Sequence, residues 1–477
     1  MPEELARLGL TVNATKTQAW AADRGTRLPP GLAALRVDSL LCLGNAAPWL
    51  DPQKDRVVVH AGADGAAAVG RARAFTARLR ELRAAGLSAE ATYTLLCTYG
   101  RGCVTHHLRA NLQTAWVREL DNVLFAALEG LLEEPLDDVR RLRTTLRLSD
   151  GGCAFPSAAQ TAPAAYAASW ALCLHDVANC LGVSTLEELR ARCPRTLQVF
   201  AQAEQALREA GALGGEPLNL LDYMREPQHK RQGLWSKAAS GASHKRLLDT
   251  LLDEEGRLSL RSAGGTGAGS FLLPRHAGDA AQPDKHFLTN LKMRLDMPVC
   301  PEGALCQHKN ATTGQLCNHP LDRKGWHARK CEVGGSRNDR HNRLRDFHSK
   351  RHTELTGYAA PTEQHVPGWD RRLPNGTIEE AKLDVATVDP NTARHIYVDW
   401  AVTCAHSTYA PRRQARSSKS GLAAVQRVDD KRARCPPRQG LDLIPMVFEA
   451  GGRPPRRRRP WCAATAPTSR KTSEGSF

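Results

Sequence analysis

Apolar residues recur every three to four positions along much of the first half of the chain. Because this is the spacing of one face of an α-helix, each such stretch predicts an amphipathic helix. The stretches cover residues 66–86, 87–100, 112–134, 164–182 and 184–211. Gly86 is placed to end the first helix, and Ser88 with Glu90 to begin the second. Residues 46–212 are therefore expected to form a helical bundle.

The helical periodicity fades after residue 212. The stretch "HKRQGLWSKAASGASHKR" is basic and polar, and residues 213–295 are expected to form an irregular basic linker. Within it, "RSAGGTGAGS" has the composition of a flexible segment and predicts a domain boundary near residues 264–270.

A different pattern begins at residue 336, where "SRNDRHNRLRDFHSKRHTELTG" predicts a basic helix. Two strand-like runs follow, "KLDVATV" and "RHIYVDWAV", joined by the turn-forming "DPNTA". Further on, "GLAAVQRVDDKRARC" predicts a helix and "LDLIPMVFEAGG" a strand. We expect an α/β domain over residues 336–450 and a disordered basic tail over residues 451–477.

The charge balance favours an anionic partner. Among 477 residues, Lys and Arg number 66 and Asp and Glu 50, which gives a formal net charge of +16. This excess is typical of nucleic-acid binding, although a solvated basic surface would have the same balance. The chain has no apolar run of 18 residues and no signal-peptide pattern, so we expect no membrane partner and reduced cysteines.

Residues 296–335 contain a candidate zinc site. Three thiolates and one imidazole form a closed structural ligand set for zinc, and here their spacing is Cys-x10-Cys-x9-His-x3-Cys. The four expected ligands are Cys306, Cys317, His327 and Cys331. Rival ligands are Cys300, His308 and His319, and the alternative is a set of reduced cysteines without metal. A zinc ion here would fix the fold and contribute no chemistry.

A second candidate motif is the run Arg340-His341-Asn342 in the basic helix. Consecutive helical residues point to different sides, so at most two of these side chains can share one site. By itself the run is more typical of a solvated basic helix than of a site, and its position directly after the candidate zinc site adds to its value.

The third candidate is a pair of acids in the two strand-like runs, Asp384 and Asp399, each flanked by apolar residues. An acid in an apolar strand is costly without a partner, and two carboxylates converging on Mg²⁺ are typical of phosphodiester cleavage. A lysine would orient or deprotonate water, and the candidates are Lys382, Lys419 and Lys431. Glu363 is a further candidate carboxylate. The alternative is two half-exposed strand residues without function.

The order of these three motifs resembles the restriction-like endonuclease at the C-terminus of site-specific non-LTR retrotransposon polyproteins, over residues 300–450. That nuclease has the PD-(D/E)xK fold and nicks target DNA to prime reverse transcription. The resemblance implies that Asp384, Asp399 and Lys431 are catalytic, with Mg²⁺ held by the two aspartates. It also implies DNA-backbone contacts by the residues Arg340, His341, Asn342, Arg343 and Arg345. Two departures are Leu383, where the family has proline, and Cys435, where it has tyrosine.

The first residues resemble another part of the same polyproteins. "LGLTVNATKTQAW" is similar to the reverse-transcriptase palm just after its catalytic aspartates, which makes residues 1–45 a palm remnant and residues 46–212 the thumb and linker. No "YADD" or "YVDD" occurs, so this chain is not expected to polymerise DNA alone. The resemblance implies a nuclear location and the element's RNA as a second partner.

The expected fold class is thus α+β and multidomain, with a helical bundle, a small zinc segment and a PD-(D/E)xK-like nuclease domain. The expected function is that of a truncated retrotransposon protein with a Mg²⁺-dependent DNA endonuclease. The alternatives are a catalytically dead, zinc-stabilised nucleic-acid-binding remnant and a decayed fragment without function.

Overall fold

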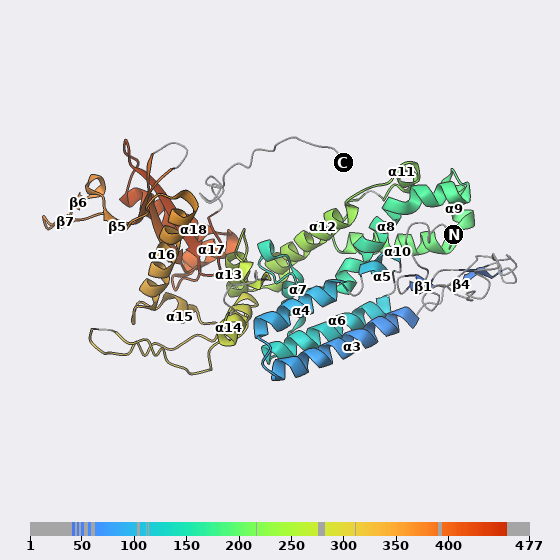
Figure 1. The fold of residues 1–477 in the computed structure, drawn as a ribbon, viewed down its shortest axis with the longest axis horizontal. Helices are drawn as coiled ribbons and strands as arrows, with labels where there is room; N and C mark the ends of the chain where they lie inside the picture. Colours follow the sequence, from blue (N-terminus) through green and yellow to red (C-terminus); the bar gives the residue numbers. More distant parts are fainter. Residues whose placement is uncertain are drawn as a thin grey trace, which may run out of the picture. The chain divides into compact units, whose positions relative to one another are not determined.

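The computed structural model describes a chain of mixed α and β structure (Figure 1). The described residues are 63–102, 105–110, 112, 114–215, 217–274, 282–310, 312–389 and 394–455, with short strands at 41–42, 45–46, 49–51 and 56–58. The palm-like segment up to residue 40 and the tail from residue 456 lie outside them. The chain divides into two compact units, Met1–Leu136 with Pro156–Ser243 and Asp137–Phe155 with His244–Phe477.

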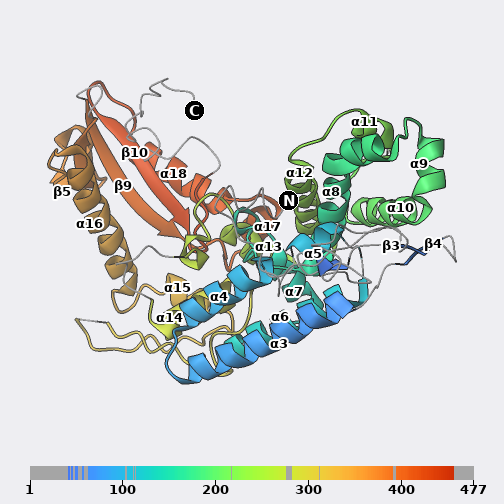
Figure 2. The same ribbon diagram turned by 45° about the vertical axis from the view of Figure 1, so that its right-hand side comes forward.

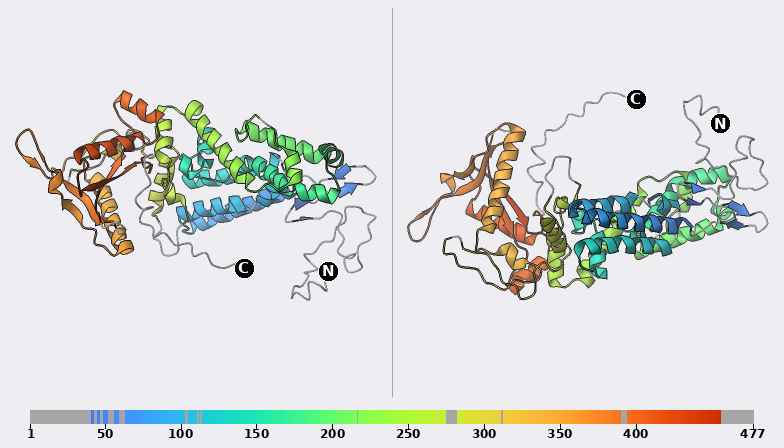
Figure 3. Two further views of the ribbon diagram at one scale, coloured as in Figure 1. Left: turned by 90° about the horizontal axis from the view of Figure 1, so that it is seen from above. Right: turned by 60° about the horizontal axis from the view of Figure 1, so that its bottom comes forward.

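The first unit is helical, as the apolar periodicity predicts. Its helices are α3 (Ala63–Ala84), α4 (Ala89–Gly102), α5 (Thr105–Ala110), α6 (Thr114–Leu132), α8 (Ala158–Leu181), α9 (Leu186–Arg192), α10 (Pro194–Glu209), α11 (Leu220–Arg225) and most of α12 (Arg231–Arg246). Helices α3 and α6 lie side by side (Figure 3). The predicted signals between α3 and α4 are confirmed, because Gly86 has a φ of +105° and Ser88 Oγ accepts the Ala91 N–H at 3.1 Å.

Four short strands precede these helices. They pair as two antiparallel ribbons, β1 (Leu41–Cys42) with β2 (Asn45–Ala46) and β3 (Trp49–Asp51) with β4 (Arg56–Val58).

The expected irregular linker over residues 213–295 is wrong in its local structure. Helices α11, α12, α13 (Glu254–Ala263) and α14 (Asp284–Arg294) occupy much of it. Buried side chains such as Trp235, Leu258 and Leu260 hold this region in tertiary contacts. These helices could not be predicted from the polar composition, because a few buried apolar residues are enough to stabilise each helix.

The glycine-rich stretch "RSAGGTGAGS" is not a free linker either. It lies inside the second unit, where the buried guanidinium of Arg294 donates hydrogen bonds to the carbonyl oxygens of Ala263 and Ala268 at 2.8 and 3.0 Å. The same guanidinium reaches the carbonyls of Leu148 and Gly152 at 2.7 Å each. A buried cation satisfied by main-chain acceptors therefore fixes this segment.

A four-stranded mixed sheet forms the centre of the second unit (Figure 2). Its strands are β5 (Thr362–His365), β8 (Lys382–Val388), β9 (His395–Thr403) and β10 (Asp442–Glu449), in the order β10-β9-β8-β5. β5 with β8 and β8 with β9 pair antiparallel, whereas β10 runs parallel to β9. The predicted strand pair is confirmed, although residues 390–393 of the expected turn lie outside the described residues. A small ribbon, β6 (Arg371–Arg372) with β7 (Ile378–Glu379), precedes β8.

Helices cover both faces of this sheet (Figure 2). On one face, Leu344 of α16 (Ser336–Thr356) packs against a core that contains Val385, Val398 and Trp400. On the other, α18 (Leu422–Arg434) packs through Ala424 and Val428 against Val447. The crossover from β9 to the parallel strand β10 contains α18 and α17 (Ala410–Ser418), as a parallel connection requires.

Two further helices complete the second unit, α7 (Asp138–Thr145) and the short α15 (Trp326–Lys330). Across the described residues of both units, no helix combines the length and apolar character needed to cross a membrane.

Candidate metal centre and active site

The cysteine-rich segment folds into a hairpin-like loop with little apolar core. Isolated antiparallel bridges join Leu305 to Pro320 and Lys309 to Leu316. At its tip, Asn310 Oδ1 accepts the N–H groups of Thr312 and Thr313 at 2.9 and 3.0 Å. After the hairpin, the one-turn helix α15 carries His327. The segment thus brings residues from three separate stretches to one point.

The four expected zinc ligands converge, with their ligand atoms all within 4.8 Å of one another. The Sγ atoms of Cys306 and Cys331 are 3.7 Å apart, and Cys317 Sγ lies 3.5 Å from His327 Nε2. A tetrahedron with Zn–S bonds of about 2.3 Å and a Zn–N bond of about 2.05 Å has S–S and S–N edges of about 3.8 and 3.6 Å. The cluster therefore has the size that a zinc ion requires and could hold one.

The rival ligands lie beside the cluster and outside it. The ring of His319 stacks on that of His327 at a centroid distance of 4.2 Å. The main-chain carbonyl of His308 accepts the Cys317 N–H at 2.8 Å, and the thiol of Cys300 is not among the converging ligand atoms. These residues shape the surroundings of the four ligands.

The acid–base properties of the cluster suit metal binding. Burial lowers the pKa of His327, which favours the neutral imidazole that binds metals. The His319 backbone N–H lowers the pKa of Cys317. Burial raises the pKa of the Cys331 thiol to about 11, so this thiolate in particular needs a nearby cation to form.

The Arg340-His341-Asn342 run lies in the second turn of α16, and its side chains diverge as expected. His341 Nε2 lies 2.8 Å from Asp384 Oδ1, whereas Arg340 Nη2 donates to the Arg329 carbonyl at 3.3 Å. Asn342 is half-buried.

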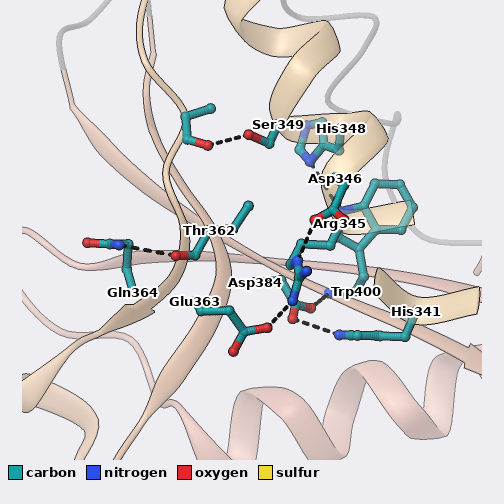
Figure 4. Close-up of polar contacts among 11 residues, drawn as sticks. His341, Arg345, Asp346, His348, Ser349, Thr362, Glu363, Gln364, Asp384 and Trp400 are labelled. Carbon is teal, nitrogen blue, oxygen red and sulfur yellow. Dashed lines mark hydrogen bonds and ion pairs between the residues drawn. The ribbon is translucent and has the colours of Figure 1, made fainter. Parts of the chain in front are cut away.

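The other two expected DNA-contacting residues differ in their surroundings. Arg343 is exposed, but Arg345 forms ion pairs with Asp346 at 2.8 Å and with Glu363 (Figure 4). The guanidinium of Arg345 is therefore already occupied by carboxylates of the protein.

The two expected catalytic aspartates are neighbours across β8 and β9. Val385 pairs with Val398, so the next position in this register sets Asp384 opposite Asp399. Asp384 is 7% exposed, and its Oδ2 accepts the Trp400 N–H at 2.5 Å while Oδ1 faces His341 (Figure 4). The two carboxyl groups are also close enough to affect each other's protonation.

Of the three candidate lysines, Lys431 is the one beside this pair. It projects from α18, is 9% exposed, and places Nζ 2.5 Å from Asp399 Oδ1. Lys382 is exposed and lies 3.2 Å from Glu380 Oε2, and Lys419 is exposed at the end of α17. The packing of α18 on the sheet thus selects a lysine that is 32 residues from Asp399 in sequence.

Glu363 lies on β5, the strand next to β8, at the position opposite Asp384. Thr362 pairs with Val385 and Gln364 with Leu383, so Glu363 falls opposite Asp384 in the register of β5 and β8. Its φ of +55° is a left-handed conformation that is rare for glutamate, and its carboxylate pairs with Arg345 (Figure 4). The three acids therefore lie in a row across three adjacent strands.

The surroundings of the two aspartates shift their pKa values in opposite directions. Burial raises the pKa of Asp399, and the neighbouring Asp384 adds to this rise while Lys431 opposes it. Burial also raises the pKa of Asp384, but hydrogen bonds from His341 and the Trp400 amide outweigh burial and leave it lowered. The bond to Asp384 raises the pKa of His341. Paired acids with divergent pKa values are typical of sites that perform acid–base chemistry.

Sequence reasoning missed the buried histidines of α16. His348 is 7% exposed and its Nδ1 accepts the Trp400 indole N–H at 3.1 Å. His352 is 3% exposed and lies 2.8 Å from Thr387 Oγ1. The spacing of His341, His348 and His352 is that of one helical face, so this signal was present in the sequence.

Comparison with known proteins leaves the geometry as the basis for interpretation. No protein-family model matches the chain, and no curated protein matches it either. The described residues contain a Cys/His cluster that fits zinc and, in the same unit, a constellation of two aspartates and a lysine in which Asp384 and Lys431 are buried and Asp399 is half-buried.

Proposed function

We propose that residues 336–450 are a Mg²⁺-dependent DNA endonuclease of the PD-(D/E)xK fold, in which Asp384, Asp399 and Lys431 are the catalytic residues. The observation that carries this proposal is the 2.5 Å approach of Lys431 Nζ to Asp399, beside Asp384 at the centre of a mixed sheet. Two carboxylates can hold a divalent cation and a lysine can orient or deprotonate water, which together suit metal-assisted phosphodiester hydrolysis.

The donor set fits magnesium. Mg²⁺ binds through oxygen ligands and commonly uses one or two carboxylates together with water and substrate phosphate, which Asp384 and Asp399 could provide. Such an ion, when bound, would neutralise phosphate charge and acidify a water molecule. Lys431 is placed to orient that water or to stabilise charge on the scissile phosphate, and His341 holds one oxygen of Asp384.

The wider assignment to a retrotransposon endonuclease rests on the order of the motifs together with two structural features. A Cys/His cluster directly precedes α16, and helices cover both faces of the mixed sheet. In this assignment the zinc ion is structural, DNA is the substrate, the element's RNA is a further partner, and the protein acts in the nucleus.

Two matched lysine variants test the role of Lys431. In Lys431→Met the long side chain stays but its charge is lost, so we expect at least a hundredfold slower nicking of supercoiled plasmid. Lys382→Met removes an exposed charge on β8, the strand that carries Asp384, and this variant should nick at the rate of the unsubstituted protein. Equal rates for the two variants would remove Lys431 from the mechanism.

A second candidate function is nucleic-acid binding without cleavage. It is favoured because both carboxylates already have partners within the protein. Both oxygens of Asp384 accept hydrogen bonds, and Asp399 is ion-paired with Lys431. These carboxylates are therefore satisfied without a metal ion. Salt-dependent DNA binding with no Mg²⁺-dependent nicking would favour this alternative.

A further inference from the structure

Two cavities adjoin one another between the Cys/His cluster and the aspartate pair. One, of about 250 Å³, is lined by His341, Trp400 and Lys431. The other, of about 490 Å³, is lined by Cys317, His327 and other residues of the zinc segment. Arg337, Arg340 and Val402 line both cavities, so together they form one groove from the metal centre to Lys431. We call it the cationic groove.

The lining of the cationic groove is strongly positive. Its cationic residues are Arg329, Lys330, Arg337, Arg340, Arg427 and Lys431. The one acid in the lining is Glu332, which pairs with Arg337 at 2.5 Å. Walls of one charge sign in a concave surface concentrate the field and attract ligands of the opposite sign.

Two of the arginines are incompletely satisfied. The Nε atoms of Arg329 and Arg340 are buried and have no hydrogen-bond partner within the described part of the chain. Unpaired buried donors beside a cavity indicate a ligand that supplies acceptor oxygens.

The metal centre fixes one wall of the cationic groove. Arg329 and Lys330 lie between the ligands His327 and Cys331, so a bound zinc ion would constrain the chain on both sides of them. The Arg329 carbonyl in turn accepts the hydrogen bond from Arg340 of α16. The positions of these cations therefore depend on the integrity of the Cys/His cluster.

We propose that the cationic groove binds the phosphodiester backbone of one nucleic-acid strand, and that zinc sets its affinity by holding Arg329 and Lys330 in place. Phosphate oxygens match the unpaired guanidinium donors, and backbone contacts would orient the strand without reading its sequence. That the strand is led toward a scissile site rests on the proposed function, whereas strand binding itself does not.

The test measures binding of fluorescein-labelled oligonucleotides to the full chain by anisotropy, without magnesium so that no cleavage occurs. Lys330→Gln and Arg337→Gln should each weaken binding about three- to tenfold and lower the slope of log K against log salt by about one. The matched control is Lys350→Gln, an exposed lysine of α16 that lines neither cavity, and it should change affinity less than twofold. Groove variants that behave like this control would overturn the proposal.

Binding measurements after zinc removal distinguish the role of the metal from that of the side-chain charges. Removing zinc with a soluble chelator should weaken binding as much as combining both groove substitutions, and added Zn²⁺ should restore it. In Lys330→Gln, zinc removal should have a smaller effect because part of the wall is already lost. Full affinity in the zinc-free protein would contradict the proposed coupling.

Oligonucleotides of equal length as duplex DNA, single-stranded DNA and RNA distinguish the possible sources of the backbone. Any of the three bound with the expected slope supports the proposal, and the tightest identifies the preferred strand. If the groove variants weaken binding but plasmid is never nicked, the groove stands and the nuclease assignment fails. If plasmid is nicked while the groove variants bind normally, the groove proposal fails alone.

Discussion

The Cys/His cluster and the aspartate pair differ in what holds them together. The cluster brings three thiols and an imidazole to one point on a loop with almost no apolar core. The aspartate pair lies on two paired strands of a sheet, with Asp384 buried and Asp399 half-buried, and His341, the Trp400 amide and Lys431 satisfy the carboxylates. We therefore expect the Cys/His cluster to need its metal to fold, and the aspartate pair, which is preformed, to need the proposed magnesium only for the reaction.

This difference separates the two metals by role. A structural ion adds its binding free energy to folding, so its removal lowers the free energy of unfolding. An ion that binds a preformed site adds little to folding, so its removal lowers activity and leaves stability nearly unchanged. The following predictions test that separation, beginning with the largest effect.

Loss of a zinc ligand should unfold the Cys/His segment. Cys331→Ser removes one of four ligands, and because metal binding to such sites is worth of order 10 kcal/mol, the loop should lose its structure. Limited proteolysis should then cut within residues 296–335. The matched control is Cys300→Ser, which removes a nearby thiol outside the cluster and should leave the proteolysis pattern unchanged. Equal sensitivity of both variants would contradict a four-ligand site.

The buried His348 is expected to make the sheet domain sensitive to acid. Burial lowers the pKa of His348 to about 4, below the value of about 6.5 expected for an unfolded chain. The stabilisation by neutral His348 is therefore complete above pH 6.5 and is lost as pH falls from 6.5 toward 4, by about 3 kcal/mol in total.

Urea unfolding at several pH values measures this loss. His348→Gln should be less stable than the unsubstituted protein at pH 7.5, and its stability should fall less between pH 6.5 and 4. His395→Gln, at an exposed position of β9, should keep the full pH dependence. A slope unchanged by His348→Gln would show that this histidine is not the titrating group.

The smallest expected effect is at His341, which should tune the aspartate pair without holding the fold. His341→Ala removes the donor to Asp384 and should raise the Mg²⁺ concentration for half-maximal nicking by about tenfold, the scale of one hydrogen bond to a charged group. His341→Gln keeps an N–H donor and should recover most of this loss. Identical Mg²⁺ dependence in both variants and the unsubstituted protein would exclude the role of His341.

Local features of this molecule could be predicted from its sequence. The convergence of Cys306, Cys317, His327 and Cys331 could be predicted because several soft potential ligands in a polar segment have few other uses. The alternating runs around Asp384 and Asp399 predicted two paired strands, because side chains alternate between faces in a strand.

Features that depend on tertiary packing could not be predicted. The choice of Lys431 over Lys382 and Lys419 depends on how α18 lies on the sheet. The helices within residues 213–295 were missed because Trp235 and a few leucines order them despite a polar composition. Arg345 was expected to contact DNA, but the fold gives it two carboxylate partners of its own.

The most direct test of the account is a plasmid-nicking assay on the full, zinc-loaded chain, with and without magnesium, comparing the unsubstituted protein with Asp384→Ala/Asp399→Ala. The account predicts nicking that requires magnesium and is abolished in the double variant, while DNA affinity and the thermal transition of the Cys/His segment stay nearly unchanged. Nicking by the double variant would contradict the assignment of the site. Absence of nicking by the unsubstituted protein, with salt-dependent DNA binding intact, would leave a zinc-stabilised protein that binds nucleic acid and does not cut it.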